Sequence, residues 1–241
     1  MRCVVHWAIG VTAVGLFISS AQAGFSYTSA TRTVTANAST ATSSGGTQTF
    51  TATNFLPFNQ TASSVDSVNN GFAHQNQNSQ LLPSEIDVAG TFSGQRPALA
   101  GSGSASGQTT ANISFSVSTT TDFALDAIIS LNDGINNIPQ GPRIVSLTGP
   151  SGTLVSWPIN LIYSPAPWTG SRSTTLTLAP GSYTLLVDLH SFIAGLPGPT
   201  LVPTTVPNYN VSLKQVPEPA AMLTLLAATP LLASRRRVHT S

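Results

Sequence analysis

Apolar and polar side chains alternate with a period of two over most of the middle of this chain. In the clearest run, Ile113, Phe115 and Val117 are separated by Ser114 and Ser116. The same spacing relates Ile86, Val88 and Phe92; Phe123, Leu125, Ala127, Ile129 and Leu131; Thr174, Leu176 and Leu178; Tyr183, Leu185, Val187 and Leu189; and Tyr209, Val211 and Leu213. Successive side chains of a strand point to opposite faces, so this pattern predicts strands with one buried and one solvated face.

Turn sequences separate these runs, notably Asn132-Asp133-Gly134, Gly149-Pro150-Ser151-Gly152 and Pro180-Gly181. Short strands between regular turns favour an all-β fold. We expect a β-sandwich, jelly-roll or immunoglobulin-like, of roughly eight to ten strands. Residues 24–215 form its body, which is long enough for one core.

Three stretches lack the pattern and are interpreted as irregular. Asn69 to Gln80 is rich in Asn and Gln and predicts a long loop. Ala98 to Gln108 is rich in Gly and Ser, which favours a flexible loop or linker, and Leu196 to Pro207 carries four prolines. Thr28 to Thr53 alternates weakly, typical of an edge strand or a partly disordered segment. The Gly/Ser stretch could divide the body into two units; we favour one sandwich, because the first part has few large apolar residues.

The charge composition excludes several classes of protein. The chain has 62 Ser and Thr residues, 9 Lys and Arg, 8 Asp and Glu, and a net charge of +1. A nucleic-acid-binding protein normally has a basic excess, which is missing here. The interior has no apolar run of about twenty residues, which excludes a polytopic membrane protein.

The N-terminus is typical of a signal peptide spanning residues 1–23, and we expect it to form a signal helix. Arg2 precedes a mostly apolar run from Val4 to Ser19, and Ala21-Gln22-Ala23 forms a small-x-small cleavage site, so signal peptidase would leave Gly24 as the first residue. An uncleaved N-terminal membrane anchor is the alternative. Cys3 is the only cysteine, so the cleaved chain would have no disulfide.

The C-terminus combines a proline-flanked acid, an apolar run and a basic cluster. Pro217-Glu218-Pro219 precedes uncharged residues from Ala220 to Ser234, followed by Arg235-Arg236-Arg237 and a tail, residues 238–241. Arginines resist transfer across a bilayer, so a translocating chain would stop here with its bulk outside. The run of about fifteen residues is short for a membrane span, and Pro230 interrupts helical hydrogen bonding. These features predict a marginal, temporary anchor with a short apolar helix.

These residues resemble the PEP-CTERM protein-sorting signal. Pro217, Glu218 and Pro219 match the tripeptide, and Arg235, Arg236 and Arg237 match the basic stop. The resemblance covers residues 216–237 and implies processing by an exosortase, a membrane cysteine protease-transpeptidase. It also implies a Gram-negative bacterium that makes exopolysaccharide and lives in biofilms or flocs. Pro230 and the tail depart from the pattern. An ordinary C-terminal anchor on a proline-rich stalk is the alternative.

Residues suited to hydrolysis are few. Asp188 and His190 would share one face of a strand, as would Glu85 and Asp87, but a solvated strand face explains both pairs. No Gly-x-Ser-x-Gly sequence occurs. We therefore expect no catalytic residues and no enzyme, with a secreted hydrolase using Asp188, His190 and Glu85 as a weaker alternative.

Two kinds of ligand are compatible with the sequence. Asp122, Asp126, Asn132, Asp133, Asn136 and Asn137 supply oxygens that suit Ca²⁺, although turn capping explains them equally well; we expect no metal or other cofactor. Trp157, Tyr163 and Trp168 lie in one proline-punctuated region, where flat side chains could stack on sugar rings or fill the core.

The sequence thus favours an exported, non-enzymatic cell-surface or extracellular-matrix protein of a biofilm. Its expected partners are signal peptidase, an exosortase-like enzyme, the membrane before processing, and exopolysaccharide; nucleic acid is not expected. A carbohydrate-binding module using the loop aromatics is the alternative.

Overall fold

The computed structural model describes residues 24–39, 44–68, 71–95, 103–131, 143–158, 168–195 and 208–217. These residues form β1 (Phe25–Ser39), β2 (Ser44–Ala52), β3 (Phe58–Asp66), β4 (Gly71–Leu82), β5 (Glu85–Gln95), β6 (Gly103–Val117), β7 (Thr121–Leu131), β8 (Arg143–Gly149), β9 (Gly152–Pro158), β10 (Trp168–Leu178), β11 (Gly181–Gly195) and β12 (Asn208–Gln215). The described part of the chain is therefore all-β, with twelve strands against the eight to ten expected. The expected signal helix and C-terminal helix lie outside the described residues.

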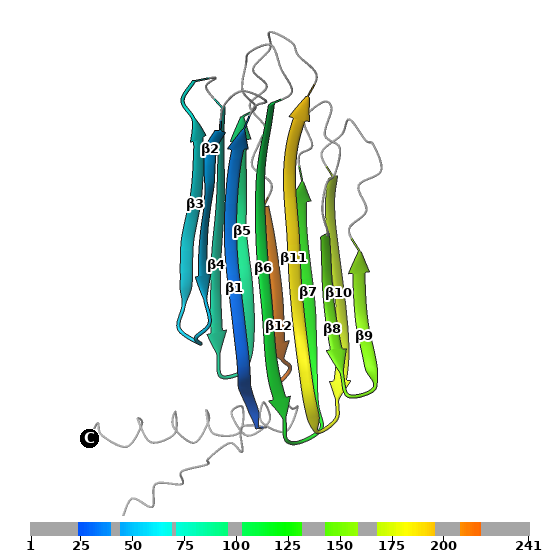
Figure 1. The fold of residues 1–241 in the computed structure, drawn as a ribbon. Helices are drawn as coiled ribbons and strands as arrows, with labels where there is room; N and C mark the ends of the chain where they lie inside the picture. Colours follow the sequence, from blue (N-terminus) through cyan, green and yellow to red (C-terminus); the bar gives the residue numbers. More distant parts are fainter. Residues whose placement is uncertain are drawn as a thin grey trace, which may run out of the picture.

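The strands form two antiparallel sheets that pack face to face (Figure 1). Sheet A has the order β2-β1-β6-β11-β8-β9, and sheet B has the order β10-β7-β12-β5-β4-β3. Both sheets combine strands from before and after the Gly/Ser stretch: β1 pairs with β6, and β5 pairs with β12. The arrangement is a β-sandwich in which neither half of the chain builds a sheet by itself.

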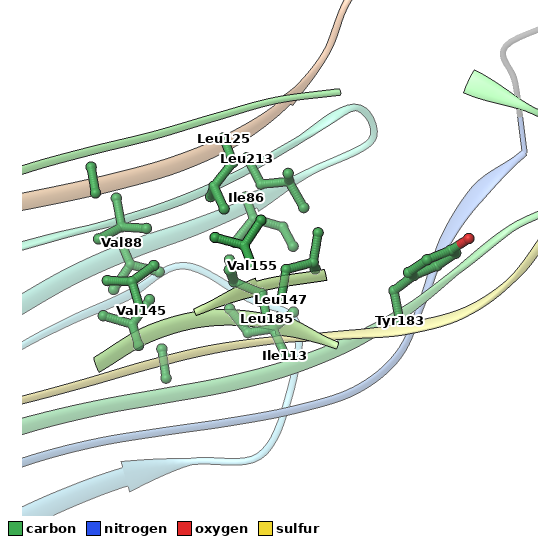
Figure 2. Packing of buried hydrophobic residues seen from close by; sticks show 14 of the residues in the cluster. Ile86, Val88, Ile113, Leu125, Val145, Leu147, Val155, Tyr183, Leu185 and Leu213 are labelled. Carbon is green, nitrogen blue, oxygen red and sulfur yellow. The ribbon is translucent and has the colours of Figure 1, made fainter. Parts of the chain in front are cut away.

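The main core lies between the sheets where large aliphatic residues meet. Its inward positions in β5, β6, β7, β11 and β12 are those of the predicted alternation, and Ile113, Leu185 and Leu213 are all fully buried. Val145, Leu147 and Val155, from β8 and β9, also belong to this core but were not predicted. Figure 2 shows Ile86, Val88, Leu125 and Leu213 of sheet B packed against Ile113, Val145, Leu147, Val155 and Leu185 of sheet A. The predicted faces of β5, β6, β7, β11 and β12 are therefore confirmed.

A second cluster uses mostly small residues, and it includes the strands that the sequence pattern missed. It contains Val34, Ala36, Ala38, Phe58, Ala62, Ala73, Phe92, Ala105 and Ile193. The predicted loop from Asn69 to Gln80 is wrong over residues 71–80, which belong to β4. In this strand Gly71, Ala73 and Gln75 point inward, and the period of two is hidden because these residues are small or polar.

Of the other two irregular interpretations within the described residues, one is wrong and one is right in part. Residues 103–108 belong to β6, and Gly107 has no room for a side chain, because an added Cβ would lie 2.5 Å from Gln75 Oε1 and from Phe92 Cδ2. Within Thr28 to Thr53, β1 lies between β2 and β6 and is not an edge strand, whereas β2 lies at the edge of sheet A. Small inward residues allow the sheets to approach closely here. Residues 196–207 lie outside the described residues.

A buried polar layer separates the two apolar clusters. It consists of Arg32, Gln75, Gln77, Ser79, Thr109 and Tyr209, of which Arg32, Gln77 and Thr109 are fully buried. Arg32 lies between Ala30 of the main core and Val34 of the second cluster, and Thr109 lies between Ala111 and Ala105 in the same way. Two hydrogen bonds of this layer cross between the sheets, from Arg32 to Ser79 and from Tyr209 to Thr109, and so restrict how the sheets can be aligned. Both side-chain polar atoms of Gln77 are buried without a partner among the described residues.

Arg32 is held by neutral partners. Its Nη2 donates to the carbonyl oxygen of Asn54 at 2.6 Å, its Nη1 donates to Ser79 Oγ at 3.4 Å, and its guanidinium lies 5.5 Å from the ring centre of Phe58. Arg32 has no carboxylate partner among the described residues. Burial therefore lowers its pKa. Through Asn54, Arg32 fixes the connection between β2 and β3.

Candidate functional site

The outward side of sheet A is lined with hydroxyl and amide side chains. They come from the positions that alternate with the core residues of β1, β2, β6 and β11. This surface, called the hydroxyl face below, comprises Thr31, Thr33, Thr35, Asn37, Thr47, Thr49, Thr51, Ser104, Ser106, Gln108, Thr110, Asn112, Ser114, Thr184, Asp188 and His190. Thr tolerates extended backbone well, which explains why such residues occupy these strands.

Cross-strand pairs join the hydroxyl face into rows. Thr33 Oγ1 and Thr51 Oγ1 lie 3.3 Å apart, and Thr35 Oγ1 and Thr49 Oγ1 lie 3.1 Å apart. Asn37 Nδ2 donates to Thr47 Oγ1 at 2.7 Å. On the other side of β6, Ser114 and Thr184 pair at 3.1 Å. The rows form a nearly uncharged array of hydrogen-bonding groups. The sequence did not predict this surface, although its Thr and Ser spacing was visible.

Asp188 is the acidic group of the hydroxyl face. Gln108 Nε2 donates to its Oδ1 at 2.9 Å, and Thr110 Oγ1 donates at 3.4 Å. His190 lies opposite Gln108 in the register, on the same face as Asp188, as predicted. The ring centres of His190 and Phe192 are 6.3 Å apart. These residues form a polar cluster with a neighbouring aromatic side chain.

Glu85 does not join that cluster. It lies in β5 of sheet B, where its Oε2 is 3.6 Å from Lys214 Nζ, whereas Asp188 lies in β11 of sheet A. Both side chains are on outward positions, so the core separates them. The three residues of the hydrolase alternative therefore do not converge on one site.

Asp87 shares the outer face of sheet B with Glu85, as predicted. Its Oδ1 is buried with no hydrogen-bond partner among the described residues. Burial, and secondly the charge of Glu85, raise its pKa above the ordinary value of 3.8. Folding thus favours the protonated carboxyl.

We expect Asp87→Asn to raise the free energy of unfolding at pH 7. The stabilisation from protonated Asp87 is complete below the unfolded-state pKa and is lost as pH rises through the higher folded-state pKa. The difference between variant and parent should therefore disappear below about pH 3.8. Urea unfolding at pH 7 and pH 3 measures it, with exposed Asp126→Asn as the control for losing one negative charge. A destabilised variant at pH 7 would contradict the assignment.

The three aromatic residues proposed for sugar contact do not form a described cluster. Trp157 lies in β9 opposite Val145 and packs partly buried against the main core. Trp168 begins β10, opposite Leu131 of β7. Tyr163 lies outside the described residues. Trp157 therefore fills part of the core, which was one of the two interpretations of these residues.

The proposed calcium ligands are only partly described. Asp122 accepts a hydrogen bond from Thr177 Oγ1 at 2.6 Å, and Asp126 lies four residues further along β7. At about 3.3 Å per residue, the two lie about 13 Å apart, too far for one ion. Asn132, Asp133, Asn136 and Asn137 lie outside the described residues. Within the described ranges, no group of three or more His, Cys, Asp or Glu side chains could hold a metal ion.

The sorting elements lie mostly outside the described residues. Gly24 and Pro217 are described, whereas Ala21, Ala23, Glu218, Pro219 and Arg235–Arg237 are not. Among the residues that are described, no helix has the length and apolar character needed to cross a membrane. The cleavage site and the sorting signal therefore stay predictions.

Comparisons with known proteins give no match. No protein-family model matches the chain, and neither the curated proteins nor the solved structures contain a significant match. The functional argument therefore depends on the residues and their geometry.

Proposed function

We propose that this chain is an exported, non-enzymatic cell-surface or extracellular-matrix protein of a biofilm, sorted through its C-terminal segment. The observation that carries the proposal is the ordered series of Pro217-Glu218-Pro219, an uncharged apolar run and Arg235-Arg236-Arg237, placed after a folded β-sandwich. The apolar run holds the chain in the membrane with the sandwich outside, until an exosortase-like enzyme processes it. We also propose that the sandwich is of the jelly-roll or immunoglobulin-like type.

The hydroxyl face supports a matrix role. Its rows present many neutral donors and acceptors and few charges, which suits contact with a neutral polyhydroxyl polymer better than with nucleic acid. A carbohydrate-binding role is the second candidate. The observation that favours this candidate is the aromatic side chain of Phe192, which lies beside His190 on this face, next to the rows of hydroxyl groups.

The proposal predicts that the native chain, recovered from its own cells and medium, lacks its C-terminal arginines. Mass spectrometry of the C-terminal peptide should find an end near Pro217 to Ala220 in the released fraction. The processed chain should co-purify with the exopolysaccharide. Replacing Pro217-Glu218-Pro219 by three alanines should leave the chain intact in the membrane fraction, since recognition is lost while the apolar run is unchanged.

Two outcomes would contradict parts of this proposal. An intact native chain through Ser241 in the membrane fraction would exclude processing and leave a tail-anchored surface domain. Release without any association with polysaccharide would exclude the carbohydrate-binding role while leaving sorting in place.

A further inference from the structure

Apolar side chains are exposed at one end of the sandwich. Phe55 is 43% exposed, Leu56 67%, Leu82 43% and Val216 37%. They belong to the β2–β3 connection, the end of β4 and the residue after β12, and together with Tyr27 they are called the exit end below. Surface apolar residues are common singly, but several from separate segments at one end suggest a contact surface.

Hydrogen bonds of Tyr27 and Arg32 hold this apolar surface in place. The ring of Tyr27 stacks on Phe55 at 5.7 Å. Its hydroxyl lies 2.6 Å from the carbonyl oxygen of Leu82 and 2.7 Å from that of Glu85, which share its one proton. Arg32 donates to the carbonyl oxygen of Asn54, directly before Phe55. The exposure of Phe55 and Leu82 is therefore maintained by the fold.

Both ends of the described chain leave from this same end. Gly24 precedes β1, and its carbonyl oxygen accepts from Ser118 N at 2.9 Å. After β12, Gln215 N donates to Ser84 O at 2.9 Å, and Val216 N donates to Asp122 O at 2.8 Å. Ser84 lies two residues after Leu82, so the chain exits beside the exposed apolar residues. In Figure 1, the start of β1 and the end of β12 lie at the same end as the β4–β5 turn.

The tether beyond this point is very short. After Pro217, only Glu218 and Pro219 precede the apolar run that begins at Ala220. Three extended steps span about 10 Å. When Ala220 enters a bilayer, Pro217 is therefore within about 10 Å of the bilayer surface, and the exit end faces the lipid.

We propose that the exit end is a membrane-contact surface, with Phe55, Leu56 and Leu82 lying against the headgroup and upper acyl region of the bilayer. This inference rests on the proposed C-terminal anchoring. Aromatic and aliphatic side chains are favoured at that depth, and burial of their apolar surface stabilises the contact. Lys214 and Glu85, which lie near this end, form an ion pair and so present little net charge to the lipid.

The opposite end of the sandwich supplies a matched control. Val68, which follows β3, is 71% exposed, close to the value for Leu56. It lies in the β3–β4 connection, whereas Leu56 lies in the β2–β3 connection, at the other end of β3. A label at Val68 thus has the same access to solvent without facing the bilayer.

The test uses the full chain with Cys3→Ser, carrying a single cysteine at Leu56→Cys or Val68→Cys. Each cysteine is labelled with an environment-sensitive fluorophore, and the chain is reconstituted in phosphatidylcholine vesicles with or without headgroup spin-labelled lipid. Flotation reports anchoring, and quenching by the spin label reports lipid contact. We expect every variant to float and the label at position 56 to be quenched at least about twofold more than that at position 68. Leu82→Cys, at a second exposed position, should behave like Leu56→Cys.

The outcomes separate this inference from the proposed function. Flotation with equal quenching at both ends would overturn the membrane contact and leave the anchor intact. Failure to float would overturn both. A blue-shifted label at position 56 without vesicles would show that the C-terminal segment, or a second copy of the chain at higher concentration, covers the surface, and would also overturn the proposal.

Discussion

Phe115→Ala is expected to lower the free energy of unfolding by about 3–5 kcal/mol. Phe115 is fully buried at the centre of an aromatic group, with ring centres 4.9 Å from Phe25, 5.6 Å from Tyr183 and 6.3 Å from Phe123. Its removal exposes three other rings to a cavity that β6, a central strand of sheet A, cannot close by moving. Urea or thermal unfolding measures the loss.

The matched control is Phe55→Ala at the exit end. This residue is 43% exposed and makes its ring contact with Tyr27, so its replacement should cost about 1 kcal/mol or less. An equal loss for the two substitutions would show that Phe115 is not in a closely packed core.

Gly90→Ala is expected to destabilise the protein by about 3 kcal/mol, the upper range for overpacking. Gly90 lies in β5 under the hydroxyl of Tyr209, and an added Cβ would lie 2.2 Å from both that oxygen and the carbonyl oxygen of Asn76. The backbone oxygen cannot move without breaking the sheet. Tyr209 would be pushed away from Thr109 Oγ1, to which its hydroxyl donates at 2.8 Å.

A double-mutant cycle with Tyr209→Phe isolates this contact. Tyr209→Phe alone loses buried hydrogen bonds to Asn76 O and Thr109, at a cost of about 1–2 kcal/mol. In the double variant the hydroxyl is absent, so one of three close contacts of the added Cβ disappears, while those with Asn76 O and with the ring Cζ at 2.6 Å stay. The combined loss should therefore be smaller than the two single losses added together. Additive losses would mean that Gly90 and Tyr209 do not press on each other, which would contradict the packing of the polar layer.

The strand faces of the main core could be predicted because large apolar residues reveal the period of two. Ile113 and Leu185 are buried as the alternation predicted, with Ser114 and Thr184 outward. The same period in β4 could not be found, because its inward residues include Gln75 and Gln77, which are polar, and Gly71, which has no side chain. The apolar pattern therefore predicted a loop where the structure has a strand that contributes to a buried polar layer.

The candidate site was predictable only in part, for the same reason. Asp188 and His190 were correctly placed on one face, because they are two residues apart on a strand. Their contacts with Gln108 and Thr110, about eighty residues earlier, depend on the pairing of β6 with β11. The separation of Glu85 from them depends on the distribution of strands between two sheets.

The sequence by itself determined the all-β class, the faces of the apolar strands, the near absence of charge and the chemistry of both chain ends. Each of these follows from composition or from the spacing of residues that are close together in the sequence. The tertiary structure alone decided that β1 lies beside β6, that Arg32 is enclosed among neutral partners, and that Phe55, Leu56 and Leu82 gather where the chain exits. These depend on contacts between distant segments, and a period of two specifies the face of a strand but not its neighbour.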